Sequence, residues 1–195
     1  MKTAISTLKM LSIAFVLGAI SCSFTACSKD DGGDKVKPEL EVETIEDLDG
    51  SGAPVFFSFS SGTAVAETST SWDIKFDGTT LSFGNGAEAI LTEGLFNNYV
   101  TAPTNGYAAD NIAGSGSWYN YTAMTEPQHA ILPIPGKIIV IKTHDDKYVK
   151  LEMLSYYEGN PDTTSDAFKD PEGRPTAKVY TFRYAIQLDG STNLK

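Results

Sequence analysis

The sequence predicts a single all-β domain built from antiparallel strands. Short runs of β-branched and aromatic residues recur after residue 50, turn residues separate them, and no stretch sustains a 3.6-residue period. The chain has 195 residues, of which 41% are hydrophobic and 11% aromatic, so it can bury a core. Once an export signal and a polar tether are set aside, the remaining length suits one domain of ordinary size.

The expected strands follow one another along the chain. They are residues 55–60, 63–67, 72–76, 79–83, 137–142, 148–154 and 178–186. Asp77-Gly78 is a strong hairpin signal between the third and fourth of these strands. Residues 88–95 are the one stretch that could form a helical turn or two.

Alternation within two strands predicts which side chains face the core. In residues 148–154 apolar positions alternate with Lys150 and Glu152, so we expect one face to be buried and the other to face water. The apolar positions of that strand include Met153, which is therefore expected in the core. The last strand places a set of large side chains on a single face: Tyr180, Phe182, Tyr184 and Ile186.

The N-terminus has the features of a lipoprotein export signal. The apolar run 10–20 follows Lys2 and Lys9 and is too short to span a bilayer, so residues 1–26 are expected to be removed. Thr25-Ala26 precede Cys27 in the form of a lipobox, which predicts a lipid on Cys27, with Cys22 as a competing acceptor. The tail after Cys27, a lysine followed by two aspartates, resembles the surface-export signal of Bacteroidetes lipoproteins.

Residues 27–50 are expected to be the lipidated cysteine and a flexible tether, and residues 51–195 the β domain. Val42, Thr44 and Ile45 could alternatively begin the first strand. With Cys22 removed and Cys27 lipidated, the domain has no thiol, which excludes disulfides and thiolate metal sites.

The charge of the chain disfavours anionic partners. The formal net charge is −10, and it becomes −12 when a signal that holds two lysines and no acid is removed. Binding to nucleic acid or to anionic lipid headgroups needs clustered basic residues, so neither partner is expected.

Catalytic patterns are missing from the sequence, and we expect no enzyme. The only histidines are His129 and His144, and His144 is interpreted as a solvated residue at a hairpin tip. The acidic stretch 162–172 lacks the spacing of a calcium-binding loop and is interpreted as a solvated acidic loop. An exported hydrolase remains an option only in principle, because no nucleophile and base are paired.

A series of landmarks resembles the HmuY family of haem-binding outer-membrane lipoproteins of Bacteroidetes. They occur in order through most of residues 42–187, at 56–62, 72–74, 103–107, 116–118, the hairpin 137–154, and 180–184. The resemblance implies an all-β fold and a protein for iron acquisition that binds haem. It also implies transfer of the haem to a TonB-dependent outer-membrane receptor.

Members of the family hold haem iron between two axial side chains, which are histidines in some and methionines in others. Position relative to Trp118 makes Met124 the best match to the second of these ligands, with His129 as a nearby substitute. The first family ligand lies on a hairpin that is short here, since residues 108–117 contain no His, Met or Tyr. The missing ligand would come from His129, from Tyr119 or Tyr121, or from a second molecule.

A second function is compatible with the same fold. The chain could be a surface accessory module that binds a protein or glycan partner without haem. The shortened hairpin favours this alternative, and exposed Trp and Tyr side chains could make its contacts.

Overall fold

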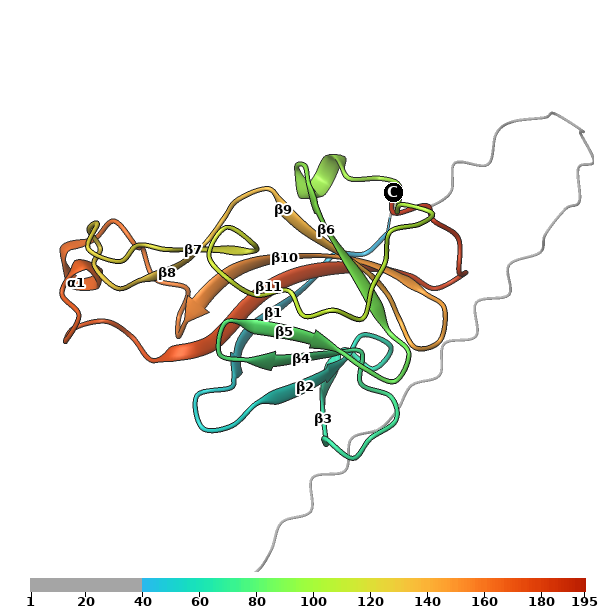
Figure 1. Ribbon diagram of the computed structural model, residues 1–195, viewed down its shortest axis with the longest axis horizontal. Coiled ribbons are helices and arrows are strands. Elements are labelled where there is room, and N and C mark those ends of the chain that lie inside the picture. Colours follow the sequence, from blue (N-terminus) through green and yellow to red (C-terminus); the bar gives the residue numbers. More distant parts are fainter. Residues whose placement is uncertain (1–39) are drawn as a thin grey trace, which may run out of the picture. The chain divides into compact units, whose positions relative to one another are not determined.

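The computed structural model describes residues 40–195, which form antiparallel β-sheets (Figure 1). The predicted signal peptide, the lipid acceptor Cys27 and the first part of the tether lie outside the described residues. Within residues 40–195, no helix is long and apolar enough to span a membrane.

The larger sheet has five strands, and all of its neighbouring strands are antiparallel. Their order across the sheet is β1 (Glu43–Asp49), β11 (Ala177–Gln187), β10 (Tyr148–Tyr157), β9 (Lys137–Lys142) and β6 (Glu88–Glu93). The predicted hairpin of residues 137–154 is therefore confirmed as β9 and β10.

The second sheet has four strands, in the order β3 (Thr63–Val65), β2 (Val55–Ser58), β4 (Ile74–Asp77) and β5 (Thr80–Phe83). Asp77 pairs with Thr80, so a two-residue turn joins β4 to β5, as the Asp-Gly signal predicts. Gly78 adopts a φ of 58° in this turn, a conformation that glycine reaches without steric cost.

Three smaller elements complete the domain. The strands β7 (Tyr119–Tyr121) and β8 (Ile131–Pro133) pair as a separate hairpin, and a 3₁₀ helix, η1, spans Phe96–Asn98. The helix α1 (Asp166–Lys169) lies with the β7–β8 hairpin at one end of the domain (Figure 1).

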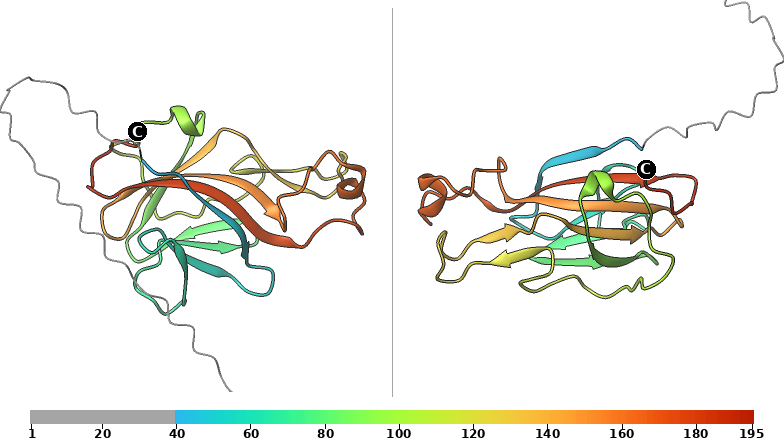
Figure 2. Two further views of the ribbon diagram at one scale, coloured as in Figure 1. Left: turned by 180° about the vertical axis from the view of Figure 1, so that it is seen from behind. Right: turned by 90° about the horizontal axis from the view of Figure 1, so that it is seen from above.

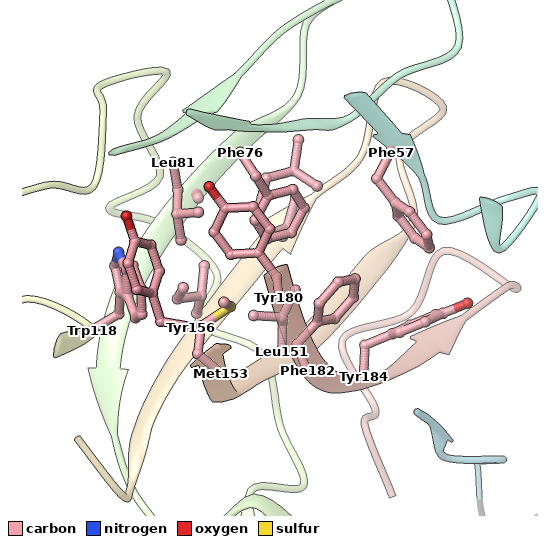
Figure 3. Close-up of a cluster of buried hydrophobic side chains, with 14 of the residues drawn as sticks. Phe57, Phe76, Leu81, Trp118, Leu151, Met153, Tyr156, Tyr180, Phe182 and Tyr184 are labelled. Carbon is pink, nitrogen blue, oxygen red and sulfur yellow. The ribbon is translucent and has the colours of Figure 1, made fainter. Parts of the chain in front are cut away.

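The main core lies between the two sheets, which are stacked as layers (Figure 2). Phe57 and Phe76 of the smaller sheet meet Phe182 of β11 at ring-centroid distances of 5.4 and 5.2 Å (Figure 3). Tyr180 and Phe182 are fully buried, which confirms the predicted face of the last strand. Each such side chain stabilises the fold by about 1.5–3 kcal/mol through burial.

The opposite face of the five-stranded sheet is also covered, so the prediction of a wet face for β10 is wrong. Lys150 and Glu152 are only 5% and 6% exposed. A second cluster, which includes Phe96, Ile138 and Val140, packs on this face. Lys150 Nζ donates to the carbonyl oxygens of Phe96 and Tyr99, so the charge is buried with partners.

Two further expectations are corrected by the strands. Residues 88–95 contain β6 instead of a helical turn, because six consecutive residues pair with β9. Strand β1 lies inside the range 27–50 expected to be tether, so the domain begins before residue 51, and the alternative that the first strand begins near Val42, Thr44 and Ile45 is confirmed. Its residues are mostly exposed at the sheet edge and only Ile45 and Leu48 pack on the core, which explains the polar composition.

Candidate functional site

The candidate site is the loop that joins β7 to β8, residues 122–130, called the β7–β8 loop below. The hairpin beneath it is fixed to the core. Trp118 is 1% exposed, and its indole Nε1 donates to the carbonyl oxygen of Thr79 at 2.9 Å. On the other strand, the Ile131 amide donates to the Tyr157 hydroxyl at 3.0 Å. The loop therefore projects from an anchored base.

Hydrogen bonds close the loop on itself. The Thr122 hydroxyl accepts from the Ala130 amide at 2.8 Å and donates to the carbonyl oxygen of Pro127. The His129 amide donates to the carbonyl oxygen of Ala123 at 2.8 Å. These bonds satisfy the loop backbone locally and fix the residues between Ala123 and His129 in a compact turn.

Arg174 fixes the far side of the loop from another part of the chain. Its guanidinium donates from Nη2 to the carbonyl oxygen of Gln128 at 3.0 Å and from Nη1 to that of His129 at 3.3 Å. The same guanidinium lies over the Phe168 ring, with Cζ 4.7 Å from the ring centroid. The planar fork of arginine suits this combination of two carbonyl oxygens and a ring.

Met124, the predicted ligand, is presented to solvent by this loop. Its side chain is 71% exposed, and it follows Ala123, which has a φ of 49°. Met153, in contrast, is 4% exposed and lies in the core, as its strand pattern predicts (Figure 3). A thioether that no packing covers is accessible to an incoming metal centre.

Tyr121 and His129, the other two candidate residues, are brought together by the hairpin. The Tyr121 hydroxyl lies 2.7 Å from His129 Nδ1, and both side chains are exposed. When Nδ1 carries the proton, it donates to the phenol oxygen and leaves the lone pair of Nε2 for a metal. Within residues 40–195, His129 Nε2 makes no hydrogen bond.

Tyr119 does not fit the role of an iron ligand. Its side chain is 6% exposed, and its hydroxyl donates to Thr79 Oγ1 at 3.2 Å. Neither tryptophan is exposed, since Trp118 is buried and Trp72 is half-buried. The accessory-module alternative thus loses the exposed Trp on which it partly depended, while the exposed Tyr121 remains.

His144 is not the solvated turn residue that the sequence suggested. Its Nδ1 lies 2.7 Å from Asp73 Oδ1, and the Asp73 side chain is fully buried. The same carboxylate accepts from the backbone amides of His144 and Phe59. His144 and Asp73 are 71 positions apart, so no local sequence pattern could predict their contact. The one hint was an aspartate between Trp72 and Ile74, because aspartate is seldom buried among apolar residues.

The acidic stretch 162–172 uses its oxygens to order its own backbone. Asp162 Oδ1 accepts from the amide and the hydroxyl of Thr164, which lowers the pKa of the Asp162 carboxyl. The Ser165 hydroxyl caps α1 by accepting from the Phe168 amide. Within residues 40–195, no group of three His, Cys, Asp or Glu side chains could hold a metal ion.

Four concave regions lie elsewhere on the domain. The largest of the four, about 360 Å³, is lined by residues 93–95 and 134–137. Another, of about 340 Å³, lies beside Phe59 and Tyr184. None of these four is lined by the β7–β8 loop, and the side chains of Met124 and His129 are exposed.

Comparison with solved structures identifies the fold. The chain superposes on the apo HmuY analog of Tannerella forsythia with a TM-score of 0.51 and 15% identity, over 79% of this chain and 99% of that one. It superposes on apo PinO from Porphyromonas gingivitis with a TM-score of 0.50 and 12% identity, over 77% and 98% of the two chains. No protein-family model matches the sequence. No curated protein matches it either.

Proposed function

We propose, from the premise that this chain has the HmuY-like fold, that it is a surface lipoprotein that binds haem for iron acquisition. Cys27 would carry the lipid that holds it at the outer membrane. Haem or a related porphyrin would bind at the β7–β8 loop and then pass to a TonB-dependent outer-membrane receptor. The fold shared with an HmuY analog supports this function, but the accessory module is compatible with the same fold, so the choice between them depends on the side chains of the loop.

The observation that carries the proposal is the pair of exposed iron donors on one ordered loop. Met124 offers a thioether sulfur, and His129 offers Nε2 of an imidazole. Both groups are axial ligands of haem iron in proteins, and thioether sulfur favours the reduced metal.

The surroundings of the two donors also suit a haem. With the proton on His129 Nδ1, the Tyr121 hydroxyl accepts from it, and such a second contact orients an imidazole and raises its basicity as a ligand. Tyr121, Met124 and Pro127 supply apolar surface for a macrocycle at the same loop. Arg174 and Thr122 hold the loop backbone, so little ordering accompanies binding.

Haemin titration of the full chain tests this function. We expect a shifted Soret band, and an affinity at least about tenfold weaker in at least one of the variants Met124→Leu and His129→Ala, equivalent to about 1.4 kcal/mol or more. Met124→Leu keeps the apolar surface and removes only the sulfur. Thr125→Ala is the matched control, because Thr125 is an exposed neighbour in the same loop without an iron donor.

Two results would contradict the proposal. A spectrum equal to that of haemin with an inert protein would leave the accessory module as the function of this fold. A Soret shift unchanged in the double variant Met124→Leu, His129→Ala would place the haem elsewhere on the domain.

A further inference from the structure

We infer, building on the proposed function, that one haem is held between the β7–β8 loops of two copies of this chain. Each copy would supply one axial ligand to the iron, from Met124 or His129. The partner is therefore a second molecule of the same protein, and the haem is the group that joins them. Three features of the described residues carry this inference.

The first feature is the closure of the loop. Two axial ligands approach iron from opposite faces, so their backbones must stand apart by two side-chain lengths and the thickness of the ring. Here the His129 amide lies 2.8 Å from the Ala123 carbonyl oxygen. Met124 is the next residue after Ala123, about 3.8 Å away between Cα atoms. Met124 and His129 therefore share one side of any ring that they contact.

The second feature is the lack of another histidine or methionine nearby among residues 40–195. Among residues 40–195, the other histidine and methionine are His144 and Met153. Met153 is buried in the core. His144 lies beyond the Tyr148 end of β10, whereas Tyr157 at the other end of this ten-residue strand contacts the hairpin. At about 3.3 Å per residue the two ends are roughly 30 Å apart.

The third feature is access for a second loop. Met124 is 71% exposed, and the hairpin lies at one end of the domain (Figure 1). A macrocycle gripped on one face would leave its other apolar face in water, which is unfavourable. A second loop would cover that face and supply the missing ligand. The acidic charge of each copy opposes association, so iron coordination must drive the pairing.

Native mass spectrometry of the full chain, released from detergent, tests the inference together with the Soret titration. We expect a species of two chains and one haem that is most abundant at about half an equivalent of haemin. Excess haemin should convert it to single chains with one haem each, because every loop then has its own ring. Iron-free protoporphyrin is the matched probe. It has no metal ion to accept axial ligands, so it should give no two-chain species.

The outcomes separate this inference from the proposed function. A Soret shift that saturates at one haem per chain, with single chains at every ratio, would overturn the bridged pair and leave haem binding intact. A two-chain species that forms equally with iron-free protoporphyrin, or in the double variant Met124→Leu, His129→Ala, would also overturn it. Absence of any Soret shift would remove both.

Discussion

His144 Nδ1 lies 2.7 Å from Oδ1 of Asp73, a carboxylate that solvent does not reach. The two residues adjoin strands of different sheets: Asp73 directly precedes β4, and His144 lies in the turn after β9. The contact therefore joins the β9–β10 turn of one sheet to the segment that enters β4 of the other.

Replacing Asp73 should destabilise the domain strongly. Asp73→Ala leaves the amides of Phe59 and His144 without their acceptor, so we expect a loss of about 2–4 kcal/mol in the free energy of unfolding. Urea denaturation measures it. Asp145→Ala is the control, because Asp145 is exposed and accepts a hydrogen bond from the hydroxyl of the nearby Thr143. A loss below about 0.5 kcal/mol for Asp73→Ala would show that the pair is dispensable.

Arg174 should control the order of the β7–β8 loop. In Arg174→Ala the carbonyl oxygens of Gln128 and His129 lose their donors, and the free energy of local opening should fall by about 1–2 kcal/mol. Hydrogen exchange at residues 122–130 measures this fall. Arg174→Lys keeps the positive charge but lacks the planar guanidinium that donates to both carbonyl oxygens, so its protection from exchange should lie between those of Arg174→Ala and the unchanged protein. Equal exchange in all three proteins would show that the loop orders itself.

Gly84 should not tolerate a side chain. A Cβ there would lie 1.9 Å from Cη2 of Trp72, and the ring cannot withdraw without breaking its edge contact with Phe56. We expect Gly84→Ala to cost about 1–3 kcal/mol in thermal or urea unfolding. Gly52→Ala is the control, since a Cβ at Gly52 meets nothing within 4 Å. Equal stability of the two variants would contradict the close approach.

The stability of the domain should decline at high pH through its buried tyrosines. Burial raises the pKa of Tyr156 from 10.0 to about 12, and burial also raises the pKa of Tyr180 and Tyr184. The unfolded chain loses these protons first, so the stabilisation is complete below pH 10 and is lost as the pH rises toward 12 for Tyr156.

Urea unfolding at several pH values, with phenolate absorbance as the second signal, measures this decline. Tyr156→Phe removes one of the titrating groups and should make the decline between pH 10 and 12 shallower. An unchanged slope in this variant would mean that the Tyr156 phenol does not contribute.

Strands with regular alternation and clear turns were predictable from the sequence. The β4–β5 hairpin follows from Asp77-Gly78, and the buried face of β11 follows from its four large side chains. The covered face of β10 was not predictable, because Lys150 and Glu152 are buried by residues distant in sequence. Glu152 accepts from Arg183 of β11 and from the Gly136 amide. In the sequence of one strand, a charged residue that is buried with its partners cannot be distinguished from a charged residue at the surface.

The position of the loop with the candidate ligands could be predicted from its distance after Trp118. Its geometry could not be predicted. Tyr121 and His129 meet across the β7–β8 hairpin, and no local sequence pattern marks where the strands of this hairpin begin and end. Arg174 acts on this loop from 45 and 46 positions away. Pairings of this kind depend on tertiary structure, so the sequence could indicate the residues without their arrangement.

The separation of Met124 and His129 from the packed core has an evolutionary consequence. Substitutions at exposed positions usually change stability by less than about 0.5 kcal/mol, so these two side chains can vary while the sheets stay intact. The framework residues Thr122 and Arg174 do not have this freedom, because they hold the backbone from which the variable positions project. Substitutions at these two positions would thus change the chemistry that the loop presents without a new fold.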